Sequence, residues 1–132
     1  MDLRRARSLT EHALQTSGRY GKPVCVAICD SMGFLLDFAR MDGAPVRSIE
    51  ISQAKAYTAT RLGISTTAFH ERLQSQGMPA TYFGDPRLTG LPGGAIIQDA
   101  QGKTLAGIGI SGLTPAQDQE LADEIAGLKA ET

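Results

Sequence analysis

Hydrophobic residues recur along this chain with the spacing of amphipathic helices and short strands. Apolar side chains at every third or fourth position between Leu3 and Ala13 predict a helix that Asp2 caps and that runs to about Ser17. Short apolar runs at positions 24–29 and 34–41 predict the two strands of a hairpin. Because apolar residues occupy both faces of these strands, we expect the hairpin to be covered on both sides.

The rest of the chain predicts further helices and another hairpin. A helix is expected from Pro45, at its first position, to about Leu62. Another helix, capped by Ser65 or Thr66, is expected to run to about Gln74, and strands are expected over 95–98 and 103–111. A Thr-Pro-Ala-Gln sequence predicts a capping box at the start of a last helix, where Pro115 takes the first helical position. Hairpins favour an antiparallel sheet with helices packed against it, so the pattern predicts a single α+β domain over residues 1–132.

Positions 77–94 are rich in glycine and proline and show no hydrophobic periodicity. Connections longer than ~12–15 residues without structure of their own are uncommon in compact domains, and they are often functional. We therefore expect this segment to form a lid or a wall of a pocket.

Composition and charge exclude several classes of function. A hydrophobic content of 42% and a charged content of 20% are ordinary for a globular domain. The net charge of −1 gives no reason to expect a nucleic-acid partner. No apolar run approaches the ~20 residues that cross a bilayer, and no apolar segment follows the N-terminal arginines. The expected location is therefore the cytoplasm, with no membrane contact.

The cysteines and histidines do not form a metal site. Cys25 and Cys29 lie four residues apart on one strand, which separates them by ~13 Å, beyond the ~7 Å limit for a disulfide. We expect two free, buried thiols. His12 and His70 lack a metal-ligand spacing, so no metal is expected. A single helical histidine such as His12 can ligate a haem iron, although it is more often a surface or core residue.

Lys55 is a candidate functional residue because its helix neighbours are small. Ser48, Ser52 and Ala59 lie on the same face at helical spacing. A lysine in such a trough can direct its ammonium into a pocket and hold a carboxylate there. It can also act as a base or an imine-forming amine if burial lowers its pKa. The alternative is a solvated lysine on an exposed face.

Arg40 and Asp42 flank the predicted strand-to-helix corner. An arginine can bind a carboxylate through two parallel hydrogen bonds, and an aspartate can accept a bond from a ligand or orient the arginine. An ion pair or an Asp-capped turn is the alternative explanation.

The glycines suggest places where another group comes close to the backbone. Gly107, Gly109 and Ser111 leave one face of the last strand almost bare, which a close-packed helix, a second subunit or a ligand would explain. A closely packed helix is the commonest of these causes. Gly93 and Gly94 are candidates to offer backbone N–H groups to an anion.

Several motifs, taken together, are specific. They are Val-Ala-Ile-Cys-Asp at 26–30 with Gly33, Ala-Arg-Met-Asp at 39–42, Ile-Ser-Gln-Ala-Lys-Ala at 51–56 with Thr-Ala at 58–59, Gly-Gly at 93–94, Gly-Ile-Gly-Ile-Ser-Gly at 107–112 and Ala-Gln-Asp at 116–118. With them the chain resembles the GlcG/HbpS-like family, also called the haem-degrading-domain family, over nearly its whole length. The sequence departs from the family in the Ala-Ile-Ile that follows Gly94. It also departs in the loop at 82–87, which we expect to set ligand choice.

The resemblance implies a profilin-like α+β fold, with an antiparallel sheet of about five strands flanked by helices. It also implies homo-oligomers with pockets near subunit contacts, and binding of haem or related tetrapyrroles. A similar domain is fused to some corrinoid adenosyltransferases, and other members look like accessory proteins of small-acid or aromatic catabolism. No residue of this chain matches a shared axial-ligand motif.

Two main functions follow from these observations. The first is a small-ligand-binding protein for haem or a carboxylate-bearing ligand, with candidate binding residues Arg40, Asp42, Lys55, Gly93 and Gly94 and with His12 as a candidate haem ligand. The second is a metal-independent accessory enzyme of the deaminase, isomerase or hydrolase type. It would act on an unsaturated or imine-bearing acid, with Lys55 or Asp42 as the acid–base group. An interaction module without a ligand is a third possibility. The binding hypothesis requires the arginine, the lysine and the glycine backbone to meet around one cavity.

Overall fold

The computed structural model describes residues 1–128. Its elements follow the chain in the order α1 (Leu3–Thr16), the 3₁₀ helix η1 (Ser17–Tyr20), β1 (Cys25–Asp30), β2 (Leu35–Arg40), α2 (Arg47–Leu62), α3 (Thr66–Gln76), the 3₁₀ helix η2 (Ala80–Phe83), β3 (Gly94–Gln98), β4 (Thr104–Ser111) and α4 (Pro115–Ala126). Helix α2 begins at Arg47, two residues after the expected start at Pro45, and Val46 precedes it without a side-chain cap. The sequence signals for the starts of the other helices are confirmed. Asp2 caps α1, Ser65 caps α3, and Thr114 and Gln117 form the capping box of α4.

The strands form one antiparallel sheet in the order β2-β1-β4-β3. The predicted α+β class is therefore confirmed. The expectation of about five strands is wrong, because the described residues form a four-stranded sheet. The irregular segment between α3 and β3 carries only the short helix η2, and its glycines and prolines provide no fifth strand.

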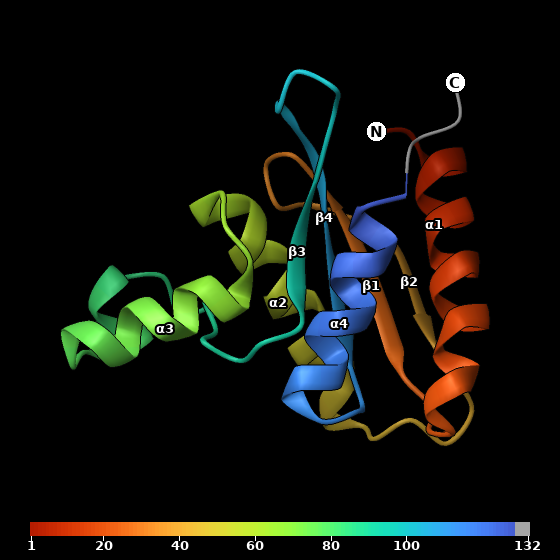
Figure 1. Ribbon diagram of the computed structural model, residues 1–132, viewed down its shortest axis with the longest axis horizontal. Helices are drawn as coiled ribbons and strands as arrows, with labels where there is room; N and C mark the ends of the chain where they lie inside the picture. The colour runs from red at the N-terminus through yellow and green to blue at the C-terminus, as the bar shows by residue number, and fades with distance from the viewer. Residues whose placement is uncertain (129–132) are drawn as a thin grey trace.

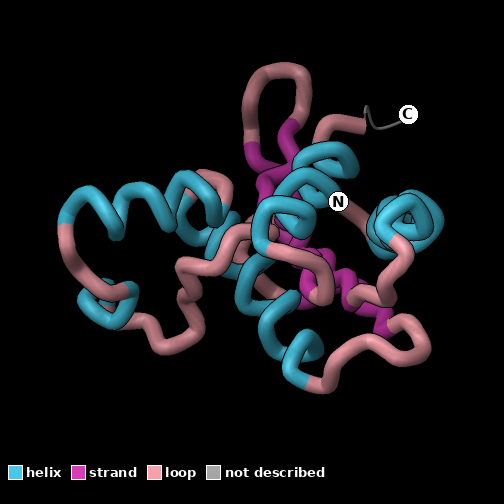
Figure 2. The backbone as a smooth tube through the Cα atoms, turned by 60° about the horizontal axis from the view of Figure 1, so that its bottom comes forward, coloured by secondary structure: helices cyan, strands magenta, loops and turns pink. Residues whose placement is uncertain are grey.

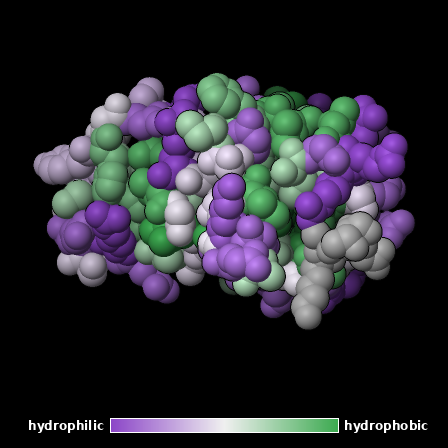
Figure 3. Space-filling view, turned by 90° about the horizontal axis from the view of Figure 1, so that it is seen from above, coloured by the Kyte–Doolittle hydropathy of each residue, from purple (hydrophilic) through white to green (hydrophobic). Residues whose placement is uncertain are grey.

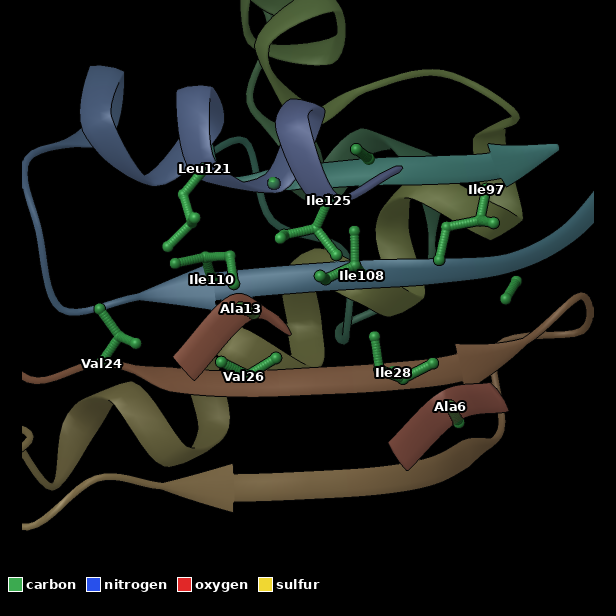
Figure 4. Packing of buried hydrophobic residues seen from close by; sticks show 13 residues of the cluster. Ala6, Ala13, Val24, Val26, Ile28, Ile97, Ile108, Ile110, Leu121 and Ile125 are labelled. Atoms are coloured by element: carbon green, nitrogen blue, oxygen red, sulfur yellow. The ribbon is translucent and has the colours of Figure 1, made fainter. Parts of the chain in front are cut away.

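Helices cover the two faces of the sheet unequally. Helices α1 and α4 lie on one face, and α2 lies on the other (Figure 1). Figure 4 shows the main core between the sheet and α1 and α4. The strand side chains in this core alternate along β1 and β4, and helix α4 packs on them. The larger fully buried side chains are Val24, Val26, Ile28, Ile108 and Ile110 from the sheet side and Leu121 and Ile125 from α4.

Helix α2 packs directly on the glycine-bare face of β4. A Cβ atom added at Gly109 would lie 1.9 Å from the carbonyl oxygen of Ser52, and one added at Gly107 would lie 2.7 Å from that of Ala56. The absence of side chains on the strand therefore lets the helix backbone approach the sheet. This confirms the close-packed helix as the reason for the glycines.

The first hairpin is covered less completely than its sequence predicts. Strand β1 is central and buried on both faces, whereas β2 forms an edge of the sheet. Helix α2 lies over β1, β4 and β3, so the start of β2 extends beyond it. Phe34 is 60% exposed and Leu35 is 49% exposed as a result. The prediction of two covered faces is right for β1 and wrong for β2.

Helix α3 and η2 extend to one side of the sheet, away from α1 and α4 (Figures 1 and 2). Phe69 of α3 is fully buried and makes an edge-to-face contact with Phe83, with 5.1 Å between the ring centroids. The chain then returns along α2 before entering β3, which places residues 86–89 beside that helix.

Figure 3 shows the molecule of Figure 1 from above, and on the face seen there hydrophobic residues are interspersed among hydrophilic ones. Across residues 1–128, no helix is both long enough and apolar enough to span a membrane.

Candidate functional site

Lys55 points into the protein interior, where two protein acceptors bind its ammonium. Its Nζ donates to the carbonyl oxygen of Ile110 at 2.8 Å and to Oδ2 of Asp118 at 3.0 Å. Lys55 is 2% exposed and Asp118 is 3% exposed. Burial lowers the pKa of Lys55 and raises the pKa of Asp118, and the attraction between the two charges opposes both shifts. The second Asp118 oxygen accepts from the backbone N–H of Leu113.

The backbone of Gly93 and Gly94 is bound within the same region. The N–H of Gly93 donates to Oε1 of Gln119 at 2.8 Å, and that of Gly94 donates to Oγ1 of Thr66 at 2.8 Å. Both groups therefore lack the free donors that the sequence predicts for an anion site. A Cβ at Gly93, where φ is +132°, would lie 2.7 Å from Nζ of Lys55, so glycine is needed for this close approach.

Gln119 connects this region to the rest of the fold. Its Oε1 also accepts from Oγ1 of Thr67 at 2.9 Å, and its Nε2 donates to the carbonyl oxygen of Gly94 at 2.9 Å. We call the set Lys55, Thr66, Gly93, Asp118 and Gln119 the buried polar core. It ties α2, α3, β3 and α4 together by hydrogen bonds between satisfied partners. Asp118 belongs to the Ala-Gln-Asp motif at 116–118, but no sequence spacing indicated that it meets Lys55, which lies 63 residues earlier. Gln119 carried no sequence signal.

Arg40 and Asp42 lie at the corner between β2 and α2. Nε and Nη2 of Arg40 both donate to the carbonyl oxygen of Ala44, at 3.2 and 3.0 Å, and so brace this corner. Asp42 is exposed. Among residues 1–128, no hydrogen bond or ion pair joins either residue to Lys55. The structure thus brings Lys55 and Gly93 together in the interior, but the predicted meeting of three groups around a cavity is not found.

His12 lies on the solvent side of α1, on the sheet face opposite α2. Within the part of the chain that the structure describes, no group of three or more His, Cys, Asp or Glu side chains is arranged to hold a metal ion. Cys25 and Cys29 are free and buried, as predicted. Burial raises the pKa of the Cys29 thiol to about 11, so this thiol is protonated at neutral pH and is a poor nucleophile.

A cavity of about 460 Å³ lies beside α2, on the side of the sheet that α2 covers. It is bounded by α2, by the start of β2 and by residues 86–89. Phe34, Leu35, Ala54 and Leu88 provide apolar walls. Residues 86–89 belong to the irregular segment, which confirms the prediction that this segment forms a pocket wall. None of the predicted site residues is among the described residues that line the cavity.

The polar end of the cavity is built around Tyr57 of α2, which is 5% exposed. Its hydroxyl donates to Oδ2 of Asp85 and accepts from Nη2 of Arg87 at 2.8 Å. The Arg87 guanidinium lies 4.0 Å from the centroid of the Tyr57 ring, and that of Arg61 lies 4.9 Å from it. The hydrogen bond from Tyr57 lowers the pKa of Asp85. We call Tyr57, Asp85 and Arg87 the rim cluster.

The rim cluster joins helix α2 to the irregular segment, although Tyr57 and Asp85 lie 28 residues apart in the sequence. Thr89 adds a further link, because its backbone N–H donates to Oγ1 of Thr58 at 2.9 Å. The sequence singled out positions 82–87 as individual to this chain. It carried no signal that Asp85 and Arg87 would meet Tyr57. For the enzymatic alternative, the residues that line the cavity provide no lysine, because Lys55 is enclosed in the buried polar core.

These features define a small α+β protein with a closed polar interior and an amphipathic cavity at its surface. Residues 1–127 match the HbpS-like family, described as haem degrading protein HbpS-like, and the chain belongs to this family.

Named relatives support this assignment. The chain is 37% identical to protein GlcG of Escherichia coli K12 over 88 residues, which cover 67% of this chain and 63% of GlcG. A crystal structure of a double mutant of HbpS from Streptomyces reticuli superimposes with a TM-score of 0.88 and 28% identity, over 99% of this chain and 88% of that one. A crystal structure of a PduOC:heme complex has a TM-score of 0.85 and 25% identity, over 96% of this chain and 92% of that one.

Proposed function

We propose that this protein is a small haem-binding protein and that its ligand occupies the cavity beside α2. The observation that carries the proposal is the amphipathic character of that cavity, which has apolar walls and a guanidinium at one end. Haem combines a large apolar ring with two carboxylates, so it matches both features. A volume of about 460 Å³ also lies in the range of small-molecule sites, ~300–1,000 Å³.

The comparisons support haem as the ligand rather than another planar acid. The family is described by haem degradation, and a structural relative was solved as a heme complex. Both facts belong to the relatives, and their extension to this chain is part of the proposal. A small carboxylate-bearing molecule would use the same walls and the same guanidinium.

The residues around the cavity fit the organic part of haem better than its iron. When bound, haem supplies an iron that proteins hold with His, Cys, Met or Tyr side chains. None of the described cavity residues is a histidine, the Cys29 thiol is protonated, and the Tyr57 hydroxyl is engaged by Asp85 and Arg87. We therefore expect this chain to hold the ligand by apolar contact and carboxylate binding. Ligation by His12 would instead locate haem on the exposed side of α1.

A hemin titration followed by the Soret band tests the proposal. Ala54→Phe should weaken hemin binding by about tenfold or more, because the new side chain fills the cavity and overlaps the ligand. Ala116→Phe, on the exposed start of α4, makes the same change on the far face of the sheet and should have no effect.

The competing results are distinct. Loss of binding in His12→Ala with normal binding in Ala54→Phe would move the ligand to α1. An unchanged Soret band with micromolar wild-type protein would remove haem from the proposal. The homo-oligomeric state and the cytoplasmic location stay predictions, and sedimentation velocity measures the first of them directly.

A further inference from the structure

Arg87 is held in place by contacts from two directions. Its guanidinium stacks on Tyr57 at 4.0 Å from the ring centroid, and its Nη2 donates to the Tyr57 hydroxyl at 2.8 Å. Its Nε lies 4.0 Å from Oδ1 of Asp85. A free arginine loses rotamer entropy when it grips a ligand, and a guanidinium that is already oriented loses less. The contacts therefore prepare Arg87 for binding.

Within residues 1–128, Arg87 also retains guanidinium donors that no protein acceptor uses. A guanidinium carries five N–H groups, and within residues 1–128 only Nη2 donates to a protein acceptor. The side chain is 61% exposed and stands at the cavity. The remaining N–H groups can form the two parallel hydrogen bonds that a carboxylate accepts.

The cavity is electrostatically polarised along α2. Glu50 lines it near the start of the helix, seven residues before Tyr57, and this corresponds to roughly 10 Å along the helix axis. At the Tyr57 end, the two cations Arg61 and Arg87 outnumber the Asp85 carboxylate. A carboxylate on the ligand is therefore repelled from the Glu50 end and attracted to the Arg87 end. The polarity orients a ligand that has one apolar and one anionic part.

We propose that Arg87 binds the carboxylate of the cavity ligand and that Tyr57 is the residue that positions Arg87. The inference deepens the proposed function, since it names the chemical group that this site recognises. It applies to a haem propionate and to the carboxylate of any smaller ligand of the cavity.

The main test compares hemin with hemin dimethyl ester, in which both carboxylates are blocked. Arg87→Gln should weaken hemin binding by about tenfold or more, the size expected for a hydrogen-bonded charge pair, and should leave ester binding unchanged. Equal hemin affinity in the wild type and Arg87→Gln would overturn the inference while haem binding itself remained established.

Arg61 provides a matched control. It lies 4.9 Å from the same ring and carries the same charge, but it does not line the cavity. Arg61→Gln should change hemin affinity by about twofold at most in 0.15 M salt, because screening weakens a charge that makes no direct contact. A loss equal to that of Arg87→Gln would attribute the effect to net charge and overturn the inference. Tyr57→Phe keeps the ring and removes the hydroxyl, so an intermediate loss for hemin alone is expected, and no loss would overturn the positioning role.

A second probe makes the outcome independent of haem. The fluorescent dye 8-anilinonaphthalene-1-sulfonate joins an apolar ring system to an anionic sulfonate. Its binding should weaken in Arg87→Gln and persist in Arg61→Gln. If hemin does not bind the wild type while dye binding depends on Arg87, the haem assignment fails and the anion site stands. Dye affinity that is equal in the wild type and Arg87→Gln, or dye that does not bind the wild type, overturns the site.

Discussion

Helix α2 carries two polar regions that differ in their access to solvent. Lys55, in the buried polar core, is 2% exposed and is bound by Ile110 and Asp118. Tyr57 follows two residues later, which corresponds to about 200° around a helix, and contacts Arg87 at the cavity. The sequence drew attention to the lysine, but the outward-facing cation is the arginine. A charged residue in a family motif can therefore stabilise the interior of the protein, whereas a residue that binds a ligand needs donors that the ligand can reach.

The largest expected effect comes from breaking the buried polar core. Lys55→Met leaves the Asp118 carboxylate buried without its partner, so we expect a loss of about 3–5 kcal/mol in the free energy of unfolding, measured with urea. The double variant Lys55→Met, Asp118→Asn lacks the unpaired carboxylate, so it should recover most of the lost free energy of unfolding. A Lys55→Met protein with normal stability but without hemin binding would transfer Lys55 from the interior to the ligand site.

The contact between α2 and β4 supports both regions, and its glycines should be the next most sensitive. Gly109→Ala would place a methyl group 1.9 Å from the Ser52 carbonyl, and backbone atoms must shift to admit it. We expect a loss of about 2–3 kcal/mol in urea unfolding. Gly18→Ala, with no atom within 4 Å of the added Cβ, should change stability by less than about 0.5 kcal/mol. Similar values for the two variants would contradict the close packing.

Cys29 lines the cavity, and its burial should make the free energy of unfolding depend on pH. Burial raises the pKa of Cys29 to about 11, whereas an unfolded thiol titrates at 9.0. The folded chain therefore holds this proton while the unfolded chain loses it, and stability falls as pH rises from 9.0 to about 11. The loss should reach about 2 kcal/mol relative to Cys29→Ala, which lacks the group. Parallel pH profiles for the two proteins would show that the thiol is hydrated.

The smallest stability effect should come from the rim cluster. Arg87→Gln removes an exposed stacking contact and one hydrogen bond, so we expect a loss of less than about 1 kcal/mol in urea unfolding. Arg87→Gln should therefore lose hemin affinity with little loss of stability, whereas Lys55→Met should mainly lose stability. A stability loss as large as that of Lys55→Met would place Arg87 among the structural residues and remove the contrast between the two regions.

Local signals predicted most of the fold. Asp2, Ser65 and the Thr114–Gln117 pair marked helix starts, because a cap depends only on residues within one turn. The glycines of β4 indicated a closely packed helix, because a strand face without side chains requires a neighbouring backbone. The count of about five strands came from the resemblance, and no local pattern in the irregular segment supported a further strand.

The sequence by itself determined the α+β class, the starts of α1, α3 and α4, the free thiols and the segment that forms a wall of the cavity. Only the tertiary structure decided that Lys55 faces Asp118, which lies 63 residues later, and that Tyr57 faces Asp85, which lies 28 residues later. The physical reason is that periodicity and caps act over one or two helical turns, while the partner of a charge depends on how helices and loops pack in three dimensions. An isolated Lys or Arg in a sequence therefore predicts a charge, and the fold determines whether that charge meets a carboxylate of the protein or one of a ligand.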